Sequence, residues 1–146
     1  MQFSGSLEIG APRDRVWAFL VDPNQVGSCG PGVESIEVVD DTRFRARAKV
    51  GVGFISARFV VDMTFAALTA PDRAQIKAHG QAPGSAVDAE AEMRLSGPPE
   101  GPTTMDWNAD VTISGTLASV GARLIEGTAN KMIGQTFDCI RTKLEA

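Results

Sequence analysis

Hydrophobic residues near the C-terminus recur at steps of three and four, which is the spacing of a helix with one apolar face. The pattern runs from Thr116 to Leu144 without a proline and predicts one helix of about 43 Å at 1.5 Å per residue. Gly121, Gly127 and Gly134 fall within it, so we expect places where the helix leaves room beside it or closely approaches another group. The remaining chain is expected to cover this long apolar stripe.

Seven other stretches alternate between apolar and polar residues, which is the period of a β-strand with one buried face. Short turns connect the last six of them, so an antiparallel meander is expected. Between the first two stretches, Pro12 favours the start of a helix that ends at Asp22-Pro23, and the turn-rich segment 23–32 leaves room for at most one more short helix. The predicted strands cover residues 2–9, 33–39, 43–50, 55–67, 73–79, 87–95 and 105–113.

These elements predict an α+β protein in which a curved antiparallel sheet of about seven strands wraps around the long C-terminal helix. One or two short helices follow the first strand. The length of 146 residues suits a single domain covering residues 1–146, and no repeat or linker divides it. Many inward positions are small, which favours a cavity between sheet and helix. These positions are Ala46, Ala48, Ala57, Ala67, Ala74, Ala78, Ala89, Ala91 and Ala109.

The cavity is the candidate ligand site, although a filled core would show the same alternation of residues. Its aromatic residues could stack on a flat ring such as a quinone. The glycine-rich turns 30–32 and 51–53 lack the spacing of a phosphate-binding loop and are expected as tight turns at the cavity mouth. The expected ligand-binding residues are Phe54, Phe59, Met63, Phe65, Met93, Trp107, Leu117, Leu124 and Met132.

Composition removes several classes of function. A net charge of −4 argues against nucleic-acid binding. Tyrosine is absent and His79, the only histidine, falls on an outward position, so we assign no catalytic residue, metal site or cofactor. An enzyme would have to use Glu34 and Glu37 near the presumed mouth, with no second group placed to work with them.

Location follows from the same sequence. No apolar run approaches the roughly 18 residues of a membrane span, and the N-terminus lacks the features of a signal peptide. We therefore expect a cytoplasmic protein in which Cys29 and Cys139 are reduced and act as small buried apolar residues.

Charges separate between strands on the outward face of the predicted sheet. One strand carries a basic row, which consists of Arg43, Arg45, Arg47 and Lys49. Later strands carry acidic residues instead, namely Asp88, Glu90, Glu92, Asp106 and Asp110. A solvated face is the usual explanation of such rows, and an acidic protein partner or anionic lipid headgroups are the alternative. The basic row is therefore the candidate partner-binding surface.

Four segments carry a resemblance to a known family: APRDRVW at 11–17, PGVESIE at 31–37, KVGVG at 49–53 and LASVGARLIEG at 117–127. Together they span most of the chain and resemble the CoxG family of carbon monoxide dehydrogenase subunits. This family lies within the START-like (SRPBCC) superfamily of helix-grip proteins, alongside lipid-transfer domains and polyketide cyclases.

The resemblance implies a non-catalytic accessory protein that binds an apolar ligand, a quinone or a lipid, and assists a molybdenum hydroxylase. It also implies peripheral contact with the inner face of the membrane, through a C-terminal tail that longer members have; this sequence stops at Ala146. Two alternatives stay open: a cyclase- or hydratase-like enzyme using the same cavity, and an assembly factor with a filled core.

Overall fold

The computed structural model describes residues 1–146 and contains one sheet and four helical segments. The strands are β1 (Gln2–Ile9), β2 (Val33–Val38), β3 (Arg43–Val52), β4 (Ile55–Thr69), β5 (Arg73–Ala82), β6 (Ser85–Ser96) and β7 (Thr103–Gly115). The helices are α1 (Arg13–Leu20), α2 (Pro23–Gly27), the 3₁₀ helix η1 (Thr116–Val120) and α3 (Ala122–Glu145).

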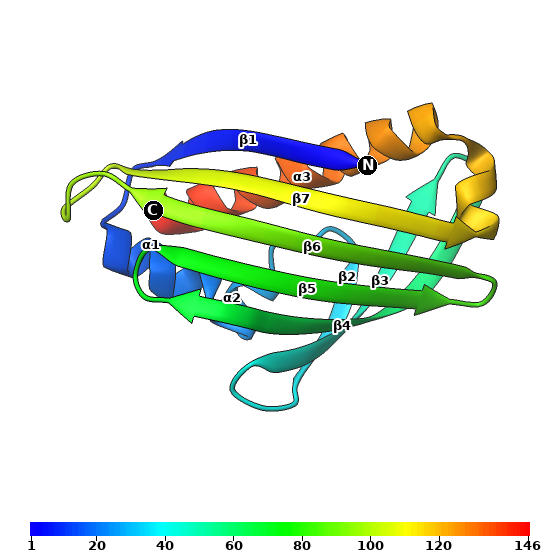
Figure 1. Ribbon diagram of the computed structural model, residues 1–146, viewed down its shortest axis with the longest axis horizontal. Helices are drawn as coiled ribbons and strands as arrows, with labels where there is room; N and C mark the ends of the chain where they lie inside the picture. Colours follow the sequence, from blue (N-terminus) through cyan, green and yellow to red (C-terminus); the bar gives the residue numbers. More distant parts are fainter.

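The seven strands form one antiparallel sheet in the order β1-β7-β6-β5-β4-β3-β2. β2 and β3 turn away from the direction of β5, β6 and β7, so the sheet curves, and α3 runs along one of its faces (Figure 1). α1 and α2 lie near the end of the sheet at which α3 finishes (Figure 1). The predicted α+β helix-grip arrangement, with its seven strands, long C-terminal helix and short helices after the first strand, is confirmed.

The single helix predicted from Thr116 is wrong in its first turns. Residues 116–120 form η1, and α3 begins only after Gly121, whose φ of 99° no L side chain adopts easily. The glycine therefore acts as the joint between two helices of different direction. α3 itself has 24 residues, or about 36 Å at 1.5 Å per residue.

The other two glycines of the helix face solvent. A Cβ placed on Gly127 or Gly134 would meet no atom within 4 Å, and both residues are exposed. The expectation that they leave room for a group beside the helix, on its inner face, is therefore wrong. The inner face is formed instead by residues such as Ile125, Thr128 and Met132, at spacings of three and four.

Strand alternation places the inward face as predicted, with one local exception. In β3, Phe44, Ala46 and Ala48 are buried. In β4 the register with β5 shifts between Phe65 and Ala67, which is a β-bulge. The extra residue reverses the side-chain phase, so Ala67 is exposed and its predicted inward position is wrong.

Apolar side chains gather into two clusters at opposite ends of the sheet. The first cluster lies where α1 and the last turns of α3 meet β1, β6 and β7. Its buried members are Ile9, Ala11, Val16, Phe19, Leu20, Cys29, Leu95, Met105, Ile140 and Leu144. The second cluster lies under η1 and the first turns of α3. Its buried members are Val52, Phe59, Ala82, Leu117 and Ile125.

A disulfide joins Cys29, just after α2, to Cys139 of α3 across a sequence separation of 110 residues. Their Cα atoms are 5.5 Å apart, a usual spacing for this bond. The expectation that both cysteines are reduced is therefore wrong. The helical register of α3 brings Cys139 against the segment after α2, and this long-range proximity has no local sequence signal.

Candidate functional site

An apolar cavity of about 210 Å³ lies between the second cluster and the first half of α3. Thirteen of the fifteen residues that line it are hydrophobic, and none is titratable. The lining consists of Val50, Val52, Phe59, Val61, Ala78, Gly80, Val87, Ala89, Val111, Ile113, Leu117, Ile125, Thr128, Ala129 and Met132.

Small residues in the middle of the sheet leave this space open. Ala78 on β5 lies directly opposite Ala89 on β6, and Gly80 lies opposite Val87. The facing helix contributes a further small side chain at Ala129. Leucine at any of these positions would reach toward the opposite wall, so the small side chains are what keep the cavity from closing.

Of the nine side chains expected to bind ligand, three line the cavity: Phe59, Leu117 and Met132. Phe59 comes from the middle of β4, Leu117 from η1 and Met132 from α3. The cavity thus joins an inward strand position to both helical segments. Met63, although half-buried, is not part of the lining.

Three of the expected residues pack elsewhere in the interior. Phe65 lies against Phe44, with ring centroids 5.8 Å apart. Met93 and Trp107 pack against the first cluster, and Trp107 meets the ring of Phe137 edge-on at 5.1 Å. Trp107 is therefore unavailable for stacking on a ring in the cavity, which corrects that expectation.

Neither Phe54 nor Leu124 lines the cavity. Phe54 sits at the tip of the β3–β4 turn and is 91% exposed, and Leu124 in the first turn of α3 is 42% exposed. Both residues were expected in the cavity only because their side chains are large and apolar. Their positions explain their absence from the lining, since Phe54 belongs to neither strand and the Leu124 side chain lies against Gly53 of the β3–β4 turn.

The residues that sequence reasoning missed share an inward strand or helix phase. Val61 and Val87 follow the same alternation as Phe59, and Ile125 and Ala129 lie on α3 at steps of three and four from the predicted Met132. This periodicity could have identified them. Which end of the sheet carries the cavity could not be read from it, because every strand offers apolar residues along its whole length.

The basic row on β3 lies on the opposite face of the sheet, as expected. Arg43 pairs with Asp40 at 2.7 Å, and the Arg45 Nε donates to Asp62 Oδ1 at 2.8 Å. Bonds from the Arg43 side chain and from the backbone N–H of Thr42 lower the pKa of Asp40 to about 2. Bonding to Asp62 raises the pKa of Arg45.

Half of the basic row makes no ion pair. Arg47 and Lys49 are exposed and have no carboxylate within ion-pair distance, whereas the neighbouring Arg58 binds Glu34 at 3.1 Å. Glu34 and Glu37 are exposed, and neither lines the cavity. The two carboxylates that an enzyme would have to use are thus absent from the apolar chamber.

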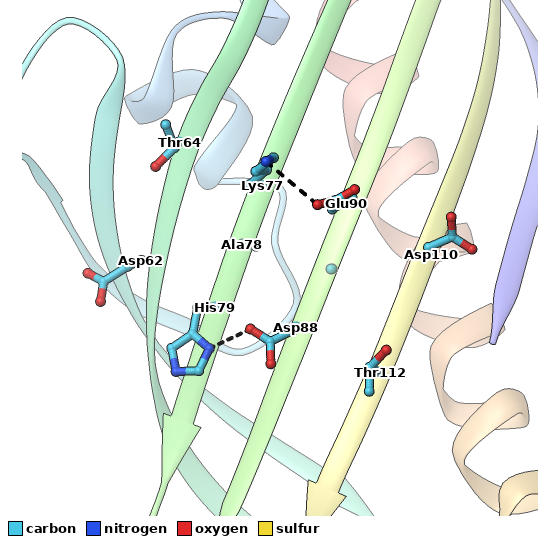
Figure 2. Close-up of a pocket in the computed structure, with 10 residues that line it drawn as sticks. Asp62, Thr64, Lys77, Ala78, His79, Asp88, Glu90, Asp110 and Thr112 are labelled. Carbon is cyan, nitrogen blue, oxygen red and sulfur yellow. Dashed lines mark hydrogen bonds and ion pairs between the residues drawn. The ribbon is translucent and has the colours of Figure 1, made fainter.

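A shallow polar depression lies on this outer face beside the basic row. Figure 2 shows Asp62, His79, Asp88 and Asp110 on neighbouring strands, with His79 Nδ1 2.6 Å from Asp88 Oδ1. His79 is exposed, as its outward position predicts. The structure contains no group of three or more His, Cys, Asp or Glu side chains placed to hold a metal ion.

No helix of the structure combines the length and the apolar character that crossing a bilayer requires.

Comparisons with known proteins agree with the fold. The sequence profile of CoxG, a family described as a subunit of carbon monoxide dehydrogenase, matches residues 5–145. Comparison with curated protein sequences finds no match. Among solved structures, a conserved protein from Geobacillus kaustophilus is 21% identical with a TM-score of 0.91, and the match covers 99% of this chain and 95% of that chain.

Two further solved structures are similar at lower identity. The Zhui aromatase/cyclase from Streptomyces sp. R1128 is 15% identical with a TM-score of 0.74, covering 99% of this chain and 93% of that chain. A START superfamily protein from Mycobacterium smegmatis is 15% identical with a TM-score of 0.67, covering 99% of this chain and 97% of that chain. At these identities the likenesses show the START-like fold alone.

Proposed function

This chain belongs to the CoxG family of carbon monoxide dehydrogenase subunits, and from that premise we propose that it is a non-catalytic accessory protein that carries an apolar ligand. The ligand is a quinone or a lipid, held in the cavity between the sheet and α3. The protein assists a molybdenum hydroxylase, and peripheral contact with a membrane surface belongs to the same proposal.

The observation that carries the proposal is the character of the cavity. It is apolar on nearly all sides and lacks any titratable side chain. A ligand burying about 200 Å² of apolar surface there would gain about 5 kcal/mol at ~25 cal/mol/Å², before the cost of association. Such a site suits reversible holding of an apolar molecule.

A cyclase-like enzyme is the second candidate, because an aromatase/cyclase shares the fold. General acid–base chemistry needs a proton-carrying group within hydrogen-bond reach of the substrate. The lining of this cavity offers no carboxylate, imidazole, thiol or amine. A shared fold does not imply cyclase activity when the cavity lacks the catalytic groups, so the carrier function is favoured.

Filling the cavity tests the proposal. The full chain is titrated with a dimethylnaphthoquinone. Both ring positions beside the carbonyl groups carry methyl groups, and these block the addition of thiols to the ring. The wild type is expected to bind, and Ala89→Leu is expected to lose at least tenfold in affinity because the added side chain enters the cavity.

Ala67→Leu is the matched control, since this alanine is on the neighbouring part of the sheet but exposed. It should bind the quinone like the wild type. Organic extraction of the purified protein followed by mass spectrometry identifies any ligand that copurifies. Absence of binding by the wild type, or equal binding by Ala89→Leu, would refute the carrier function.

Arg47 and Lys49 are the proposed contact to the partner enzyme or to anionic headgroups, because these two cations of the basic row are free of ion pairs. Replacing both by Glu should weaken binding to the molybdenum hydroxylase, and the loss should shrink as salt rises. Arg45 is a poorer test, because its replacement also breaks the pair with Asp62.

A further inference from the structure

Thr128 is the only polar side chain among the residues that line the cavity. It lies on the inner side of α3, one turn after Leu124 and one turn before Met132. Apart from Gly80, every other lining residue presents only hydrocarbon or thioether groups. A ligand in this chamber therefore has one side-chain hydroxyl within its surroundings.

Thr128 also differs from the other threonines of α3 in its hydrogen bonding. Thr136 Oγ1 donates to the carbonyl of Met132 at 2.8 Å, and Thr142 Oγ1 donates to the carbonyl of Asp138 at 2.8 Å. Both follow the usual pattern in which a helical threonine bonds the carbonyl four residues before it. The Thr128 hydroxyl makes neither this bond nor any other hydrogen bond within the protein.

Thr128 lies at the rim of the cavity. The residue is half-buried, and it lines both the inner chamber and an open groove beside the first turns of α3. No other residue belongs to both linings. The groove is bordered by Val120, Leu124 and Lys131. A polar group on a ligand whose apolar body fills the chamber would meet Thr128 at this rim.

We propose that Thr128 determines ligand specificity by donating its hydroxyl hydrogen to a carbonyl oxygen of the ligand. The inference rests on the proposed carrier function and narrows its ligand to an apolar ring compound that bears a carbonyl group. A purely hydrocarbon ligand gains nothing from the hydroxyl. A carbonyl placed in the same chamber without a donor would lose its hydrogen bond to water and gain none in return.

The test compares two ligands of the same ring shape. The full chain is titrated with the dimethylnaphthoquinone and with the corresponding dimethylnaphthalene, and the measured quantity is the ratio of their two dissociation constants. The ratio cancels changes in the cavity that affect both ligands equally. Thr128→Val replaces the hydroxyl by a methyl group of similar size and should reduce the preference for the quinone by about three- to tenfold, the value of one neutral hydrogen bond.

Two control variants separate this role from a structural one. Thr128→Ser keeps the hydroxyl and should restore most of the preference. Thr136→Val removes a hydroxyl that already bonds the backbone one turn beyond Met132, and it should leave the ratio unchanged. Equal loss in Thr136→Val and Thr128→Val would overturn the assignment.

The two proposals fail in different ways. If the wild type binds both ligands and Thr128→Val leaves their ratio unchanged, Thr128 does not select the ligand, while the carrier function stands. If the wild type binds neither ligand, the carrier function is wrong, and the role of Thr128 falls with it.

Discussion

The disulfide between Cys29 and Cys139 should stabilise the fold strongly without affecting the cavity. It closes a loop spanning a sequence separation of 110 residues, for which the loss of unfolded-state entropy corresponds to about 5 kcal/mol at 25 °C. Both cysteines belong to the first apolar cluster, whereas the cavity lies with the second. Stability and ligand binding are therefore expected to respond separately.

The perturbation is reduction by dithiothreitol, with urea unfolding followed by circular dichroism. We expect reduction to lower the free energy of unfolding by about 3 to 5 kcal/mol. With a slope of about 2 kcal/mol per molar urea, the unfolding midpoint would fall by about 2 M. The affinity for the dimethylnaphthalene, which dithiothreitol cannot reduce, is measured below the unfolding transition and should change by less than about twofold because the chamber contacts neither sulfur.

A variant with both cysteines replaced by Ala provides the control. Dithiothreitol should have no effect on its midpoint, which separates loss of the bond from other effects of the reductant. Thiol titration of the denatured wild type should detect no free thiol, since both cysteines are paired. An unchanged unfolding midpoint for the reduced wild type would show that the disulfide does not stabilise the fold. A loss of ligand affinity on reduction would show that the disulfide end of the sheet and the cavity end do not respond separately.

Two further predictions concern glycines and a carboxylate. Gly127→Ala should raise the free energy of unfolding by about 0.5 to 1 kcal/mol through helix propensity, because the added Cβ meets nothing within 4 Å. Gly121→Ala should lower the free energy of unfolding by about 1 to 2 kcal/mol, because Gly121 has a φ of 99°. Equal effects of the two substitutions in thermal unfolding would contradict the helix break assigned to Gly121. The pKa of Asp40 is lowered from 3.8 to about 2, so its contribution to stability is complete above the unfolded pKa and disappears as the pH falls toward 2. Asp40→Asn should therefore flatten the acid limb of a stability profile between pH 4 and 2, and identical limbs for the two proteins would show that Arg43 does not stabilise this carboxylate.

Local periodicity was sufficient to predict the sheet and its inward face. The alternation in residues 43–50 gives the correct buried set, since side-chain direction along a strand depends only on position within that strand. The rule failed at the bulge after Phe65, where one extra residue reversed the phase of Ala67. No residue type in that stretch distinguishes a bulged strand from a regular one.

The helix prediction failed for a related reason. Residues 116–120 keep apolar spacing of three and four because η1 also turns one face toward the sheet, so periodicity alone joined them to α3. The break depends on the backbone conformation of Gly121, and glycine is compatible with both a helix and a turn. Gly127 is also a glycine and yet lies within the regular helix α3.

The candidate site was only partly predictable from the sequence. Phe59, Leu117 and Met132 were identified because they are apolar and in phase. Trp107 satisfies the same criteria and yet fills the first cluster, because packing against Phe137 is decided by tertiary contacts. The pairing of Cys29 with Cys139 and the free hydroxyl of Thr128 likewise depend on three-dimensional neighbours.

In the proposed function, an apolar molecule occupies the chamber between the sheet and the first half of α3. A crystal structure of the full chain with the dimethylnaphthoquinone tests it most directly. We predict electron density for the ring among Phe59, Ile113 and Met132, with a carbonyl oxygen within hydrogen-bond distance of the Thr128 hydroxyl. An empty chamber in crystals that hold the quinone elsewhere, such as in the polar depression around His79, would contradict it.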